Sequence, residues 1–298
     1  MSSPSRASLA HDYIAKLRSC ATPDAADAYL RDHPDLIGAD TVQALAEAVR
    51  HSVRVDAREA LRLADAAQAI AARVAHPGAL GLSNRAKANA LWYAGDLKSA
   101  IELFEKAATE FEQAGMPEEL GRTFSSSIQP LALLGEYERA FAAAAKARDI
   151  FQTAGDRLRM ARLEINVANI HHRQDRFADA LAAYRRAYEE LAPHRDAEGM
   201  AVALHNMAVC LIALNDFGQA LETYSNARKL CDSNDMPRLA AQADYNIAYL
   251  YFLRGDYRTA IDELRLARES CLGHEDVYHA ALCDVDQAEI YIELNLAE

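Results

Sequence analysis

The residues best suited to chemistry in this 298-residue sequence are an adjacent histidine pair, His171 and His172, a third histidine, His205, and five cysteines. Adjacent residues on a helix point about 100° apart, so the histidine pair cannot chelate one metal ion. The cysteines form no Cys-x-x-Cys motif, and no Ser/His/Asp set or glycine-rich phosphate loop occurs. The sequence therefore predicts no metal site, no cofactor and no enzymatic activity.

Asparagines recur at intervals of 40 residues, at Asn166, Asn206 and Asn246. A primary amide is both donor and acceptor, so it can pair with the C=O and N–H of one residue in an extended peptide. Two further amides lie one helical turn after this asparagine position. They are Asn169, in the repeat of Asn166, and Gln129, in the repeat before it. We expect these amides to hold a peptide backbone. The alternative is that they bond to neighbouring helices and fix the stacking.

Charged side chains beside these amides indicate what the partner would contain. Arg122 and Arg162 lie one turn before the asparagine position of their repeats, and guanidinium forks suit carboxylates or a phosphate. We therefore expect acidic residues in the bound segment, unless the two arginines are simply solvated. His205 is expected to contact the same ligand, and the corresponding positions become acidic from Asp286 onward.

A 40-residue repeat sets all of these spacings. A block with two alanines seven residues apart recurs in the chain, and it begins at Gly95, Gly135, Asp175, Asn215 and Gly255. Forty residues make one helical hairpin with its turns, and such hairpins bury their apolar faces only by stacking on neighbours. Hydrophobic residues make up 51% of the chain, and glycine and proline are few. The predicted fold class is therefore all-α, a solenoid of stacked helix hairpins.

The repeat also predicts the organisation of the chain. We expect a helical cap over residues 1–42 and a solenoid over 43–298. The solenoid would comprise a degenerate repeat (43–80), five clear repeats (81–276) and a half repeat (277–298). Solenoids normally end in a polar cap, so a half repeat favours a piece of a longer protein.

The half repeat offers an alternative function. The segment Tyr278–Leu296 is expected to form one helix whose apolar strip would meet a missing second helix. That strip contains Ala281, Val285, Ala288 and Ile292. An uncovered strip of this kind could make a homodimer, so self-assembly through the C-terminal helix is the second hypothesis.

The small residues of the repeat resemble those of the tetratricopeptide repeat (TPR), in the 40-residue, long-helix form found in kinesin light chain. One small residue in the first helix and two alanines in the second carry the resemblance, at Ala168/Ala180/Ala187 and at Ala208/Ala220/Ala227. It covers roughly residues 43–298 and implies a right-handed α-α superhelix with the first helices along a concave groove. It also implies that the asparagines contact a peptide backbone. Residues 283–296 are similar to the repeat half of bacterial TPR proteins that continue into a CHAT-type protease, which would make this chain a sensor without its enzyme.

Composition narrows the partners and the compartment. The net charge is −12, and residues 201–298 hold 16 acidic but only 7 basic side chains. Without a Lys/Arg stripe, nucleic acid and anionic membranes are poor partners. No signal peptide and no membrane-spanning stretch is evident, and the odd cysteine count favours reduced thiols in the cytoplasm. The expected partner is therefore a protein or an extended peptide segment.

Overall fold

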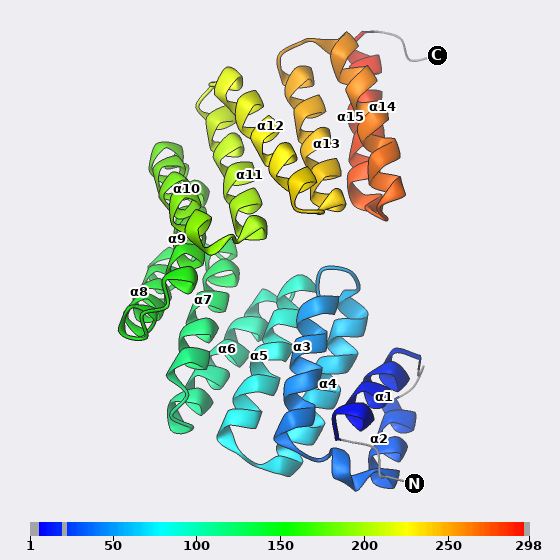
Figure 1. Ribbon diagram of the computed structural model, residues 1–298, viewed down its shortest axis with the longest axis vertical. Helices are drawn as coiled ribbons and strands as arrows, with labels where there is room; N and C mark the ends of the chain where they lie inside the picture. Colours follow the sequence, from blue (N-terminus) through cyan, green and yellow to red (C-terminus); the bar gives the residue numbers. More distant parts are fainter. Residues whose placement is uncertain (1–5, 20–22, 295–298) are drawn as a thin grey trace. The chain divides into compact units, whose positions relative to one another are not determined.

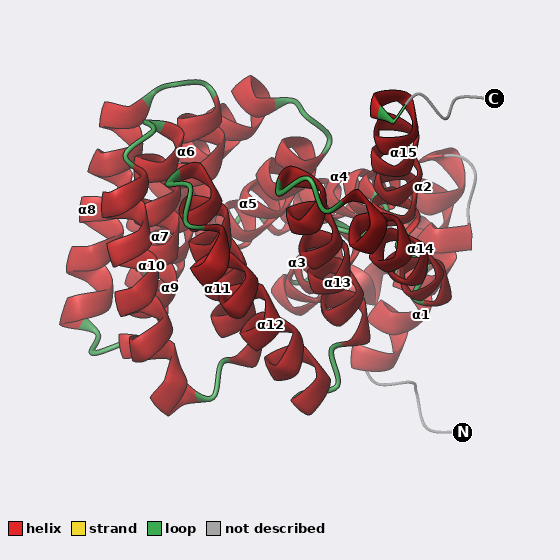
Figure 2. Ribbon diagram, turned by 90° about the horizontal axis from the view of Figure 1, so that it is seen from above, coloured by secondary structure: helices red, strands yellow, loops and turns green. Residues whose placement is uncertain are grey.

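The computed structural model describes residues 6–19 and 23–294, and every regular element within these ranges is a helix (Figures 1 and 2). The expected all-α fold is therefore confirmed. Residues 1–5, 20–22 and 295–298, which belong to the predicted cap and half repeat, lie outside the described residues. The chain divides into two compact units, Met1–Asp156 and Arg157–Glu298, and each is described by itself.

The first unit begins with two short helices and continues as three antiparallel hairpins, α3/α4, α5/α6 and α7/α8. Its elements are α1 (Arg6–Ser19), α2 (Pro23–Asp32), the 3₁₀ turn η1 (Pro34–Leu36), α3 (Ala39–Ser52), α4 (Ala57–Val74), α5 (Pro77–Tyr93), α6 (Leu97–Gln113), α7 (Pro117–Leu133) and α8 (Tyr137–Thr153). Each hairpin packs on the next, since α4 contacts α5 and α6 contacts α7.

The second unit repeats this pattern with the hairpins α9/α10, α11/α12 and α13/α14, and ends on α15, which packs on α14 and α13. Its elements are α9 (Arg157–Arg173), α10 (Phe177–Leu191), the 3₁₀ turn η2 (Ala192–His194), α11 (Ala197–Ala213), α12 (Phe217–Ser233), α13 (Pro237–Leu253), α14 (Tyr257–Gly273) and α15 (Val277–Glu293).

The helices end at residues with a left-handed backbone (positive φ), which recur every 20 positions. All positive-φ residues between 75 and 275 fall on this interval: Ala75, Gly95, Gly115, Gly135, Gly155, Asp175, Arg195, Asn215, Asp235, Gly255 and Glu275. At a representative turn, the amide of Asp96 donates to the carbonyl of Leu91 (3.0 Å), which satisfies an orphan carbonyl of the helix end. The Asp96 carboxylate then accepts from the amide of Ser99 and caps the next helix. The left-handed residue thus recurs once per helix, whereas the side-chain cap does not, since α7, α8, α10 and α13 begin without one.

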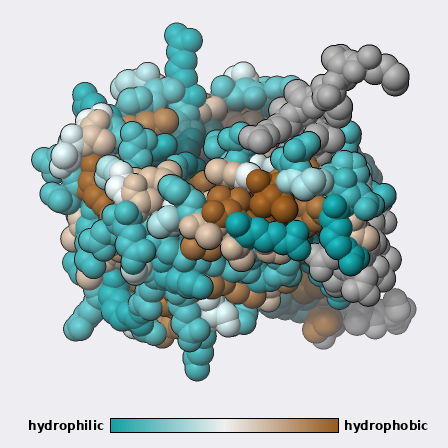
Figure 3. All heavy atoms as spheres, turned by 90° about the horizontal axis from the view of Figure 1, so that it is seen from below, coloured by the Kyte–Doolittle hydropathy of each residue, from teal (hydrophilic) through white to brown (hydrophobic). Residues whose placement is uncertain are grey.

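Alanine makes the close helix packing possible. Every alanine of the predicted pairs is buried, from Ala60 and Ala67 in α4 to Ala260 and Ala267 in α14. Cys231 and Cys271, which share their repeat position with Phe111 and Phe151, are buried as well. Hydrophobic residues thus fill the interior, and the face shown in Figure 3 is mostly hydrophilic, with one broad hydrophobic area and several smaller ones.

The two helices of each hairpin also fit together through paired residues 30 positions apart. A β-carbon on Gly121 would lie 2.8 Å from Phe151, and one on Gly81 would lie 2.9 Å from Phe111. Where the second position holds a smaller side chain, the first position holds alanine. These pairs are Ala161/Leu191, Ala201/Cys231 and Ala241/Cys271, each within one core cluster.

Candidate functional site

The predicted site residues all lie on first helices of the hairpins, but in two different units. Arg122 and Gln129 are on α7, in the first unit. The second unit holds the others: Arg162, Asn166 and Asn169 on α9, His205 and Asn206 on α11, and Asn246 on α13. The two groups are therefore considered separately.

On α7, Arg122 is engaged by the chain itself. Its Nη1 lies 2.8 Å from Oε1 of Glu119, one turn earlier, and the buried Arg85 also pairs with this carboxylate. Burial raises the pKa of Glu119, but the two arginines outweigh it and hold the pKa below its usual value. A carboxylate shared by α5 and α7 thus joins neighbouring hairpins.

Arg162 makes the equivalent connection in the second unit. Its Nε lies 2.6 Å from Oδ2 of Asp196, whose side chain is 7% exposed and also accepts from the amide of Gly199 to cap α11. The bond from Arg162 lowers the pKa of Asp196 against the effect of burial. The Arg162 side chain remains 56% exposed, so it links two hairpins while one side of it faces solvent.

Asn169 and Asn206 contact one another across adjacent first helices. Nδ2 of Asn206 donates to Oδ1 of Asn169 (3.3 Å), and the same oxygen accepts from the hydroxyl of the buried Tyr184 on α10. Asn166 lies one turn earlier on α9 and is partly buried. The Asn169–Asn206 bond corresponds to the alternative weighed above, in which an amide fixes the stacking.

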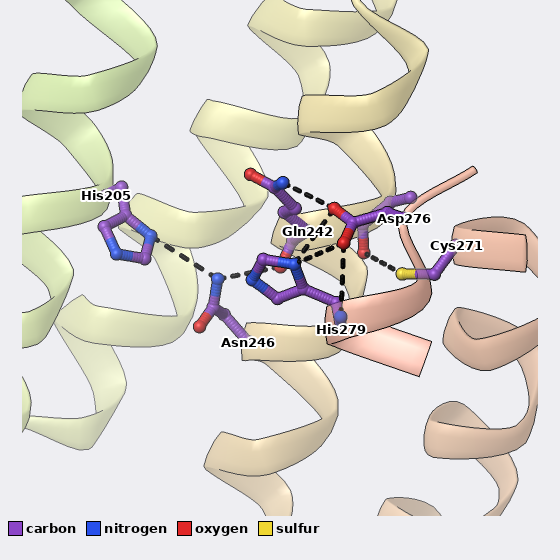
Figure 4. A network of polar contacts seen from close by, with 7 residues as sticks. His205, Gln242, Asn246, Cys271, Asp276 and His279 are labelled. Atoms are coloured by element: carbon purple, nitrogen blue, oxygen red, sulfur yellow. Dashed lines mark hydrogen bonds and ion pairs between the residues drawn. The ribbon is translucent and has the colours of Figure 1, made fainter. Parts of the chain in front are cut away.

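Asn246 forms a different arrangement with His205 (Figure 4). Its Nδ2 donates to the carbonyl oxygen of Gln242 (2.7 Å), which fixes the orientation of the amide because a carbonyl can only accept. The same Nδ2 lies 3.4 Å from Nδ1 of His205, which must then be the acceptor. Neutral His205 therefore carries its proton on Nε2 and presents a donor, while Asn246 presents Oδ1 as an acceptor.

The surroundings of His205 favour its neutral form. Desolvation is the main cause that lowers its pKa, and the nearby His279 lowers it further. The residue is nevertheless exposed, so the imidazole lies at the surface of the second unit.

A buried acid, Asp276, holds two further side chains close to the His205–Asn246 pair. Asp276, at the start of α15, is 7% exposed and accepts from Nε2 of Gln242 (2.6 Å) and from Nδ1 of His279 (2.9 Å). Burial raises the pKa of Asp276, but these bonds outweigh it and the pKa is lowered. The carboxylate thus fixes Gln242 and His279 across α13 and α15, as Figure 4 shows.

These side chains surround a pocket of about 200 Å³ between α11, α12, α13 and α15. Its polar side consists of His205, Gln242, Asn246, His279 and the ring of Tyr224. The remainder is apolar and is formed by Ala201, Val202, Ala227, Cys231, Leu239 and Ala243. The pocket lies wholly within the second unit.

Gln242, Tyr224, Asp276 and His279 were not among the predicted site residues. Gln242 does share the repeat position of Arg122 and Arg162, so the 40-residue spacing could have indicated it. Asp276 has the sequence signature of an ordinary helix cap, and only the packing of α15 on α13 buries it.

The described residues bear on two of the expectations above, which concern metal sites and membrane-spanning helices. Within residues 6–19 and 23–294, no three His, Cys, Asp or Glu side chains gather as potential ligands. Burial is the main cause that lowers the pKa values of His171 and His172. None of the helices in those ranges combines the length and apolarity that crossing a bilayer requires.

Comparison with known families identifies the repeat. The sequence model of the soluble NSF attachment protein (SNAP) family matches residues 78–229, about half of the chain. The chain belongs to the SNAP family. The segment that carries the SNAP match runs from α5 into α12 and includes Arg122, Arg162 and His205. It stops before Gln242, Asn246 and His279, so the pocket is formed partly by residues beyond the match.

Solved structures confirm the TPR-type fold of this SNAP-family chain. A signal-transduction ATPase (STAND) from Pyrococcus horikoshii with a TPR sensor is 15% identical, with a TM-score of 0.67 over 98% of this chain. A Rap protein complexed with competence and sporulation factor is 15% identical over 97% of this chain and 85% of its own, with a TM-score of 0.66. NprR in complex with its cognate peptide NprX is 12% identical over 97% and 84%, with a TM-score of 0.64.

The extent of these similarities limits what they show. This chain spans only 44% of the length of the Pyrococcus ATPase. At 12–15% identity, the three structures establish the helical-repeat fold. Sequence comparison with curated proteins finds no match.

Proposed function

We propose that this SNAP-family chain is a non-catalytic scaffold that binds an extended protein segment along the first helices of its second unit. The observation that carries the proposal is the His205–Asn246 pair, which presents a donor and an acceptor side by side at the rim of a pocket. These are the complements of a peptide C=O and N–H. Asn166 and Asn206 occupy the equivalent positions of the two preceding hairpins, which suits an extended ligand crossing the helices.

The amides would supply only part of the affinity. A net hydrogen bond contributes about 1 kcal/mol, so three amides alone would give weak binding and neighbouring side chains must add to it. NprR, solved in complex with its cognate peptide, has the same fold, which supports a peptide ligand for this chain. The Pyrococcus ATPase, which has a TPR sensor, supports a role as the sensor part of a longer regulated protein, such as a CHAT-type protease.

We also propose that the bound segment contains acidic residues, which requires that they compete for arginines that are already paired. Arg122 and Arg162 already pair with Glu119 and Asp196, so ligand carboxylates would have to share or replace these partners. Reversing both arginine charges should then weaken binding of acidic peptides selectively. Unchanged affinity would leave the arginines with a purely structural role.

The test is selection from a phage-displayed library of random 15-residue peptides. Wild-type protein and Asn166→Ala/Asn206→Ala/Asn246→Ala are compared, with circular dichroism to verify the fold of both. Asn226→Ala, an exposed asparagine on the second helix α12, is the matched control. Peptides that bind the wild type and the control but not the triple variant support the proposal. If the wild type enriches no peptide, or the triple variant binds equally well, the proposal is wrong.

A second candidate function is self-association through α15. The strip Ala281, Val285, Ala288 and Ile292 is exposed on this helix, with Val285 at 59% and Ile292 at 65%. Exposed apolar strips of this kind mark interaction surfaces. Sedimentation equilibrium should show a dimer that Val285→Glu/Ile292→Glu dissociates. A monomer mass at every concentration would refute this candidate.

A further inference from the structure

We infer that the pocket between α11, α12, α13 and α15 takes one aliphatic side chain of the bound segment, that of leucine, isoleucine or methionine. This inference rests on the proposed function and adds to it the residue class that the second unit selects. The three observations that support it are the chemistry of the pocket lining, the pocket volume and the polar groups at the rim.

The lining favours an uncharged, apolar group. Six of its eleven residues contribute small or aliphatic side chains, or the buried thiol of Cys231. The histidine at the rim accepts from Asn246 at Nδ1, as a neutral imidazole does, and the carboxylate of Asp276 already accepts from Gln242 and His279. A charged ligand side chain would lose its hydration here without gaining a partner of opposite charge.

The volume has room for the four heavy atoms of a leucine, isoleucine or methionine side chain. The pocket measures about 200 Å³, and an apolar cavity of roughly 150 Å³ in another protein is known to accept benzene. Alanine would leave most of this space empty. An aliphatic side chain fills it and removes its own surface from water.

The rim explains why the occupant belongs to a peptide. His205 and Asn246 both line the pocket. Their mutual contact does not use Nε2–H of His205 or Oδ1 of Asn246, and these two groups suit the carbonyl and amide of the residue whose side chain enters the pocket. An aliphatic small molecule would fill the pocket without satisfying these two groups. The donor–acceptor pair therefore favours the peptide, and the side chain supplies specificity.

The experiment uses the whole chain and peptides selected as described above, with affinity measured by fluorescence anisotropy. Val202 lines the pocket and is 36% exposed, so Val202→Phe can place a ring in the space without repacking the core. Val55→Phe, at an 80% exposed turn of the first unit, is the matched control.

Selected peptides should share an aliphatic residue at one fixed position. Replacing it with alanine should weaken binding to wild type roughly ten- to hundredfold. The same replacement should change binding to Val202→Phe less than about threefold, because the filled pocket can no longer accommodate the aliphatic side chain of the peptide. Val55→Phe should behave as wild type.

Two results would overturn the pocket inference while leaving the proposed function intact. One is a set of selected peptides with no shared aliphatic position. The other is an equal effect of the alanine replacement on wild type and Val202→Phe. If Asn246→Ala still weakens binding in either case, the groove binds peptides without this pocket. If the wild type selects no peptide at all, both inferences fail together.

Discussion

Replacing Gly121 with alanine should destabilise the first unit, although the same change usually stabilises a helix. Gly121 is the fifth residue of α7, and its φ is not in the left-handed region, so the backbone itself tolerates alanine. The new methyl group would lie 2.8 Å from a ring carbon of Phe151 and 2.9 Å from Cγ2 of Ile150. Both contacts are too close for carbon atoms, and both partners belong to the packed helix α8.

The magnitude follows from two opposing effects. Alanine improves helix propensity by up to about 1 kcal/mol over glycine, whereas overpacking a well-packed core costs about 1–3 kcal/mol. We expect a net loss in the free energy of unfolding of about 0–2 kcal/mol for Gly121→Ala. Gly218→Ala is the control, since its β-carbon would approach nothing closer than 3.9 Å. The control should be neutral or slightly stabilising.

A double-mutant cycle separates the clash from other effects. Phe151→Leu reproduces the Ala161/Leu191 combination of the next repeat, so the double variant Gly121→Ala/Phe151→Leu should recover about 1 kcal/mol or more relative to additivity. Urea unfolding followed by circular dichroism gives all four free energies. A Gly121→Ala variant as stable as Gly218→Ala, with additive behaviour in the cycle, would refute the view that these pairs fit the two helices of a hairpin together.

Three further predictions concern turns, ion pairs and titration. Glu275→Gly should raise the free energy of unfolding by about 1 kcal/mol because Glu275 is left-handed, and Gly255→Ala should lower it by a similar amount; equal thermal melting of both variants would contradict this. Arg85→Ala should cost about 3 kcal/mol or more, because it leaves the half-buried carboxylate of Glu119 poorly paired, whereas Arg157→Ala, which breaks the exposed pair with Glu190, should cost less than about 1 kcal/mol; similar urea midpoints would refute the distinction. The pKa of His205 should lie below 6.5 by NMR. The unfolded chain then takes up the proton at a higher pH than the folded chain, so the free energy of unfolding is unaffected by this group above pH 6.5 and falls as the pH drops below it. A pKa at or above 6.5 would contradict the desolvation of the ring.

The fold was predictable because its signals are local and repeated. The alanine pairs and the turns at Gly95, Gly135 and Asn215 are visible at a fixed spacing, and each hairpin contacts mainly its neighbours. The turns at Arg195 and Glu275 carry no such signal, since neither residue favours a left-handed backbone. They adopt it because the flanking helices require it.

The site was less predictable because it depends on which neighbours each side chain meets. Sequence spacing placed Asn206 and Asn246 at equivalent positions, yet one bonds to Asn169 and the other to His205. Arg162 was expected to meet a ligand carboxylate, and the structure pairs it with Asp196, 34 positions later in the chain. The pocket depends on four helices together, so no local pattern could reveal it.

We propose above that a peptide contacts the amides on the first helices of the second unit. The most direct measurement is the ¹⁵N–¹H spectrum of the side-chain amides, assigned by single Asn→Ala substitutions and recorded while a selected peptide is added. We expect the Asn246 amide signal to shift in proportion to occupancy, the Asn206 signal to shift as well, and the Asn226 signal to stay in place. A peptide that saturates the protein while the Asn246 and Asn206 signals remain fixed would contradict contact with these amides.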